Sequence, residues 1–86
     1  MRREAARPEP RRPQPGEPLF ELMRGDQRLR GELRDHGQFG VEAQFLLDRE
    51  LLIGKRFSSR VLALDWAEKM RVEYLARGWS AVLANA

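Results

Sequence analysis

The sequence predicts an α+β fold: a four-stranded antiparallel β-meander with one C-terminal α-helix packed across it. Between residues 19 and 57, short segments of alternating apolar and polar residues are separated by turn signals, and such a series at intervals of about eight to twelve residues is typical of a meander. Between residues 58 and 78, apolar residues recur every three or four positions, which indicates an amphipathic helix. The predicted order of elements is therefore β-β-β-β-α.

The strands follow from the alternation, and we expect them at residues 19–23, 28–35, 39–47 and 51–57. The third segment alternates most regularly, and its inward-facing residues are Phe39, Val41, Ala43, Phe45 and Leu47. In the second segment, Leu29, Gly31 and Leu33 share one face. The direction of the side chains in the fourth strand stays open.

The helix has recognisable start and stop signals. Ser58 is a suitable N-cap because its hydroxyl can accept a hydrogen bond from the first turn. Gly78 suits the left-handed residue that follows the last turn, and we expect Trp79 to fold back on Tyr74.

This helix carries two apolar faces. The first is expected to pack on the sheet, with its central side chains over Phe39, Val41 and Phe45, and it consists of Leu62, Ala63, Trp66, Ala67, Met70 and Tyr74. The second lies on nearly the opposite side. A helix that packs only on its own domain needs one apolar face, so the second predicts an interface with a partner. Its members are Val61, Leu64, Glu68, Val72 and Leu75. Glu68 is expected at the rim or paired with Arg71 of the partner subunit.

Composition divides the chain into a Pro/Arg-rich arm over residues 1–18, a β-β-β-β-α domain over 19–79 and a short tail over 80–86. The arm holds all five prolines and five arginines and has no periodic apolar pattern, so we expect it to be disordered. A domain this small is marginally stable alone, and the chain has no cysteine that could form a disulfide. Oligomerisation is the remaining means of stabilisation, which favours a homodimer.

Several functional classes are not expected. Residues 19–86 hold eleven Lys or Arg against ten Asp or Glu, so the foldable part is nearly neutral although the chain has a net charge of +3. The single histidine, His36, lies in a predicted turn, and no phosphate-binding glycine spacing is present. We therefore expect no enzyme, cofactor, metal or small-molecule substrate. No apolar run approaches the roughly 20 residues of a membrane span, so a cytoplasmic protein without membrane contact is expected.

The outward face of the sheet suggests an alternative function, because a basic track on a sheet can bind single-stranded DNA or RNA. Its candidate contacts are Arg28, Arg30, Arg34 and Arg56. However, Glu21, Glu32 and Glu42 share that face, and the alternation turns the phenylalanines of the third strand inward. A ladder of cross-strand ion pairs and a homodimeric or partner-binding module are therefore the favoured interpretation.

From Phe20 to Trp79 the chain resembles small, functionally uncharacterised bacterial proteins in which a β-meander leads into one amphipathic helix. The resemblance is carried by Glu32-Leu33-Arg34, Gly40-Val41-Glu42, Glu50-Leu51-Leu52, Ala67-Glu68 and Gly78-Trp79, and it implies no activity. The order of elements is also similar in topology to the PUR repeat, two of which form a whirly-like domain that binds single-stranded DNA or RNA. That similarity implies that one chain supplies one repeat and that a homodimer forms the domain.

Overall fold

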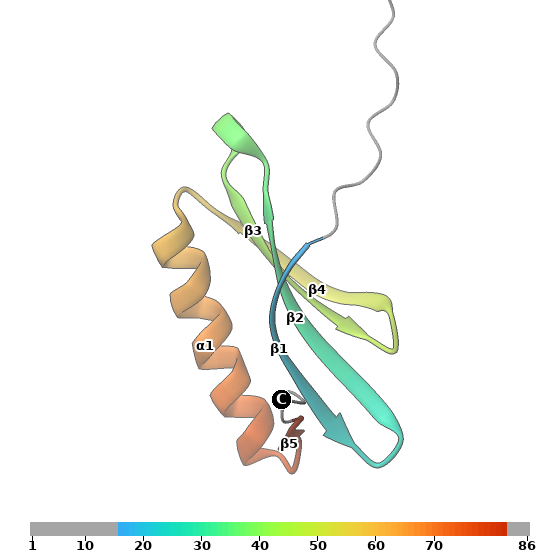
Figure 1. The fold of residues 1–86 in the computed structure, drawn as a ribbon. Helices are drawn as coiled ribbons and strands as arrows, with labels where there is room; N and C mark the ends of the chain where they lie inside the picture. Colours follow the sequence, from blue (N-terminus) through green and yellow to red (C-terminus); the bar gives the residue numbers. More distant parts are fainter. Residues whose placement is uncertain (1–15, 83–86) are drawn as a thin grey trace, which may run out of the picture.

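The computed structural model describes residues 16–82, which form one antiparallel sheet with a single helix across one of its faces (Figure 1). The α+β class, the antiparallel sheet and the helix are thereby confirmed. The spatial order of the strands is β4-β3-β2-β1-β5, so the first four strands form a meander. The elements are β1 (Glu17–Arg24), β2 (Gln27–Asp35), the 3₁₀ helix η1 (Gly37–Phe39), β3 (Val41–Leu47), β4 (Glu50–Phe57), α1 (Arg60–Ala76) and β5 (Ser80–Ala81).

Both ends of the domain extend further than the sequence predicts. β1 begins at Glu17, which lies within the segment expected to be a disordered arm; residues 1–15 of that arm are outside the described residues. At the other end, β5 falls within the expected tail and pairs with Leu22 and Met23 of β1. The turn at Gly78 (φ 100°) returns the chain to the β1 edge, and this gives the sheet its fifth strand.

The core lies between the sheet and α1 and is centred on Phe45, which is fully buried. Its ring centroid is 5.5 Å from those of Phe20 and Trp66 and 5.8 Å from that of Tyr74. Gly31 faces this core as predicted, and the Phe20 ring occupies the space that a Cβ at position 31 would need. The fully or nearly fully buried apolar residues are Leu22, Leu29, Leu33, Ala43, Phe45, Ala63, Ala67 and Trp79.

Phe39 does not belong to the core, so the prediction that it lies in a strand beneath the helix is wrong. It ends η1 and is 65% exposed. β3 begins only at Val41 because Gly40 (φ 99°, ψ −169°) has a conformation that side-chain-bearing residues rarely adopt. The strand alternation therefore cannot continue back through Gly40 to Phe39.

The N-cap of α1 is Ser59, so the prediction of Ser58 is wrong by one residue. The Ser59 hydroxyl accepts a hydrogen bond from the Leu62 N–H at 3.3 Å, and its backbone is extended. The C-terminal prediction is confirmed. The Trp79 N–H donates to the Tyr74 carbonyl at 3.1 Å, and the two rings lie edge to face with centroids 6.1 Å apart.

Candidate interaction surfaces

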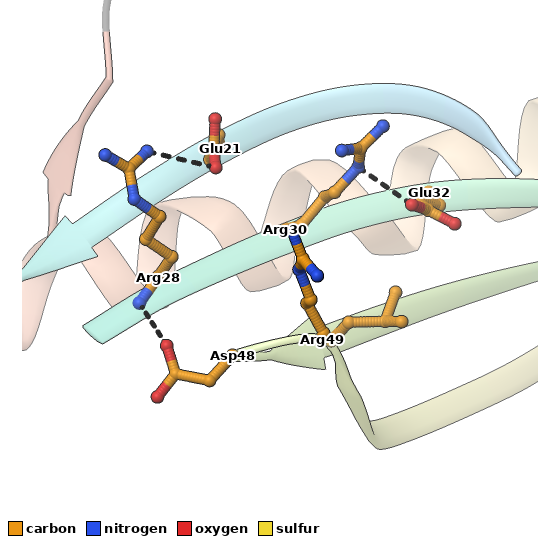
Figure 2. Close-up of a pocket in the computed structure, with 7 residues that line it drawn as sticks. Glu21, Arg28, Arg30, Glu32, Asp48 and Arg49 are labelled. Carbon is orange, nitrogen blue, oxygen red and sulfur yellow. Dashed lines mark hydrogen bonds and ion pairs between the residues drawn. The ribbon is translucent and has the colours of Figure 1, made fainter.

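Three of the four arginines predicted for the outward face of the sheet lie on β2, and each is close to a carboxylate. Arg28 Nη1 is 3.3 Å from Glu21 Oε2 of β1, and Arg30 Nε is 2.8 Å from Glu32 Oε2. Arg34 Nη2 is 3.7 Å from the other oxygen of Glu32. Figure 2 shows the Arg28 and Arg30 pairs. Because Glu32 is only 8% exposed, the guanidinium groups of Arg30 and Arg34 balance a buried charge.

The fourth arginine, Arg56 of β4, is the cross-strand neighbour of Glu42, and its Nη2 lies 4.0 Å from Glu42 Oε1. The same oxygen is 2.8 Å from His36 Nε2. Burial raises the pKa of Glu42, but hydrogen bonds with His36 and Gln44 and the nearby charges of His36 and Arg56 outweigh burial and hold the pKa below its usual value. The His36 side chain thus links the β2–β3 connection to β3 through Glu42.

A shallow cavity of about 460 Å³ opens on this outward face (Figure 2). It is lined by Glu21, Arg28, Arg30, Glu32, Leu46, Asp48 and Arg49. Three arginines are thus opposed by three carboxylates, so the lining has no net charge at neutral pH. In addition, the Asp48 carboxylate accepts a hydrogen bond from the Arg28 backbone N–H at 2.9 Å. This carboxylate therefore links the β3–β4 turn to β2.

The aromatic rings of residues 16–82 gather on the other side of the sheet. The rings of Phe20 and Tyr74 contact Phe45, and the Phe57 ring contacts Trp66 with centroids 5.7 Å apart. The exposed Phe39 lies in η1, at the end of the sheet. The four arginines therefore share their face with carboxylates and not with stacked rings.

The structure divides the second apolar face of the helix into two parts. Val61 and Val72 are 74% and 52% exposed, whereas Leu64 and Leu75 are partly buried and pack against the core of their own domain. Glu68 is paired with Arg71 of the same helix, with distances of 2.9 and 2.6 Å. Among Val61, Leu64, Glu68, Val72 and Leu75, only Val61 and Val72 are thus exposed apolar side chains.

A different apolar surface, which the sequence pattern did not predict, lies on β4. Leu51, Leu52 and Ile53 are 58%, 51% and 40% exposed, and among the described strands β4 pairs only with β3. The register shifts between Phe45 and Leu46, because Ile53 pairs with Phe45 and Leu51 with Leu46 while Leu52 is the extra residue. The run of three consecutive apolar residues, which breaks the alternation, was the signal for this bulge.

The described residues offer little sign of other kinds of site. None of the helices in residues 16–82 has the length and apolar character that a membrane span requires. In the same range, no group of three or more histidine, aspartate or glutamate side chains is arranged to hold a metal ion. No family model, curated protein or solved structure matches this chain.

Proposed function

We propose that this protein is a non-enzymatic interaction module that self-associates through the exposed edge of its sheet. The observation that carries the proposal is the row of exposed apolar side chains on β4, from Leu51 to Ile53. An edge strand also presents unpaired backbone N–H and C=O groups, which a further strand can satisfy. Apolar burial and backbone pairing therefore favour association at the same place.

The edge of β4 is a better candidate for a self-association surface than the second apolar face of the helix. Leu64 and Leu75 already contribute to their own core, and Glu68 is neutralised within the helix by Arg71. The remaining Val61 and Val72 lie eleven positions apart, or about three helical turns. Two isolated valines are ordinary for a protein surface.

The arginines of the outward face do not favour nucleic-acid binding. Arg28, Arg30 and Arg56 each lie within ion-pair distance of a carboxylate. A nucleic acid would have to displace these carboxylates, and it would find no stacked rings on that face for its bases.

Sedimentation velocity of the full chain, with and without a labelled single-stranded oligonucleotide, tests the proposal. We expect a species of twice the 10.0 kDa chain mass at micromolar concentration, unchanged by oligonucleotide and almost independent of salt. A 10 kDa species that shifts only with oligonucleotide and reverts as salt rises would replace the proposal with nucleic-acid binding. A monomer under all conditions would overturn self-association.

A variant with Arg28→Gln and Arg56→Gln controls for charge in this experiment. Both side chains are about half exposed, so their replacement is tolerated by the fold. Arg30 and Arg34 are left intact because they balance the buried Glu32. We expect the double variant to sediment like the wild type.

A further inference from the structure

We propose that the partner of β4 is the β4 strand of a second copy, paired antiparallel about a two-fold axis that passes beside Ile53. This inference rests on the self-association proposed above and names its surface and its register. It extends the two sheets of the copies into one continuous sheet. The register follows from the residues of β4 that lie on the helix side of the sheet.

Four residues of β4 share that side, and the last of them is Phe57, which pairs with Val41 at the end of the strand. Glu50, Ile53 and Lys55 pair with Leu47, Phe45 and Ala43 of β3, and these three partners alternate along the inward face. The extra residue of the bulge, Leu52, makes the step from Glu50 to Ile53 equivalent to the two-residue step from Ile53 to Lys55. The part of this row from Glu50 to Lys55 is therefore symmetric about Ile53: an acid, an isoleucine and a base.

Such a row is complementary to itself only when it is reversed. An antiparallel second copy places its Lys55 opposite Glu50, its Ile53 opposite Ile53 and its Glu50 opposite Lys55. Opposite charges directly across two strands stabilise a sheet, and like charges destabilise it. The two-fold axis makes each favourable pair occur twice.

Both charged groups are available for this pairing. Within residues 16–82, neither Glu50 nor Lys55 forms an ion pair, although most other charged side chains of the sheet do. The Lys55 ammonium lies 5.5 Å from the centre of the Phe57 ring and 5.9 Å from that of Trp66. It is thus held on the helix side of β4, where the reversed copy presents its Glu50.

The opposite edge of the sheet does not offer an equivalent surface. There, β5 covers part of β1 by pairing with Leu22 and Met23. The uncovered part of β1 contains Pro18, which has no N–H to donate to a further strand. A proline discourages pairing at an edge.

The helix adds to the proposed contact. A two-fold axis perpendicular to the sheet leaves both helices on the same side, and α1 contacts β4 as well as β3 and β2. Leu62 is 50% exposed and lies one turn before Trp66, whose ring contacts Phe57 of β4; it therefore faces the second copy.

Cysteine cross-linking tests the register directly, because the chain contains no natural cysteine. Residues opposite each other in an antiparallel pair have Cα atoms about 4.5–5.5 Å apart, which lies within disulfide range. We expect the Ile53→Cys variant to form a covalent dimer on mild oxidation. Val72→Cys, on the exposed face of the helix, is the matched control and is expected to stay monomeric in denaturing electrophoresis.

Charge reversal provides a second test that leaves the apolar residues in place. Lys55→Glu would face Glu50 twice per dimer, so we expect the dissociation constant to rise at least about tenfold. Glu50→Lys is expected to do the same, and the Glu50→Lys/Lys55→Glu double variant to restore the wild-type value. Asp26→Lys, in the β1–β2 turn, changes the net charge as Glu50→Lys does and is expected to have no such effect.

The outcomes separate this inference from the proposed self-association. A wild-type dimer that cross-links through Val72→Cys and not through Ile53→Cys would overturn the β4 interface while self-association stands. A dimer in which the double charge reversal fails to restore association would overturn the register centred on Ile53. A wild-type monomer would overturn both proposals. Circular dichroism of every variant checks that each one is folded.

Discussion

The two edges of the sheet differ in whether another described segment of the chain covers them. At the β1 edge, the chain turns back at Gly78 after the end of the helix, the nearly buried Trp79 anchors the returning segment, and β5 pairs with β1. At the β4 edge, no described segment covers the strand, and apolar side chains from Leu51 to Ile53 stay exposed. The first edge is therefore closed by its own chain, whereas the second presents the exposed surface that we propose for self-association.

This difference leads to an experimental distinction. Substitutions at the closed edge should lower the free energy of unfolding of a single chain, because they remove contacts within the core. Substitutions at the open edge should leave that free energy nearly unchanged and should instead alter the dissociation constant between chains.

Trp79→Ala at the closed edge should have the largest effect. The side chain is 7% exposed, lies edge to face with Tyr74, and has the Arg24 guanidinium 4.8 Å from its ring centre. Truncating a buried tryptophan costs about 3–5 kcal/mol, and we expect that loss in urea denaturation followed by circular dichroism. Trp79→Phe should retain much of the stability. A loss below about 1 kcal/mol for alanine would mean that the closed edge does not depend on this anchor.

Gly40→Ala tests the connection between η1 and β3, which lies beside the end of β4. Gly40 adopts φ 99° and ψ −169°, and a Cβ there would overlap the Phe57 carbonyl oxygen at the end of β4. We expect a loss of about 1–3 kcal/mol from this backbone strain. Gly25→Ala is the matched control, because Gly25 has φ 62° and open space around it. Equal effects of the two substitutions in thermal denaturation would contradict this account.

Gly40 also explains why one part of the fold could not be predicted from the sequence. The alternation of apolar residues correctly predicted the strands and the inward direction of Gly31. The prediction failed at Phe39, because the spacing of apolar residues does not reveal that Gly40 adopts a backbone conformation that other residues rarely adopt. A glycine next to the end of a regular alternation was the available signal.

The candidate surface was harder to predict than the fold. Alternation cannot assign faces to Leu51, Leu52 and Ile53, because the bulge shifts the phase within the run. The helix pattern suggested a second apolar face, but it could not reveal that Leu64 and Leu75 reach their own core. Exposure depends on the width of the sheet beneath the helix, which no local pattern contains.

The pH dependence of stability should also distinguish two ion-paired carboxylates, Glu17 on β1 and Glu42 on β3. Hydrogen bonding to Arg60 lowers the pKa of Glu17 on β1, but Glu17 is half exposed and screened by solvent. The pKa of Glu42, beside β4, is lowered in a more buried position. A lowered folded-state pKa gives stability that is present above the unfolded pKa, about 4.3, and is lost as the pH falls through the folded pKa.

We therefore expect Glu42→Gln to destabilise the domain at neutral pH by up to about 1 kcal/mol, and Glu17→Gln to do so by less. The difference between each variant and the wild type should shrink as the pH falls from about 6 to about 3. Urea denaturation at a series of pH values measures both curves. A Glu17→Gln effect that exceeds that of Glu42→Gln would show that exposure does not rank the two ion pairs.

Leu52→Lys at the open edge should change the stability of a single chain least of all. Leu52 is 51% exposed and is the extra residue of the bulge, so its removal leaves the cross-strand pairs of β4 with β3 intact. We expect the unfolding free energy, measured at a concentration where chains are monomeric, to stay within about 0.5 kcal/mol of the wild type. Lysine on an edge strand nevertheless opposes pairing with another chain, so the same substitution should weaken the dimer in sedimentation equilibrium. A clear loss of monomer stability without a change in association would mean that Leu52 serves its own domain, and that the two edges do not differ as their exposure indicates.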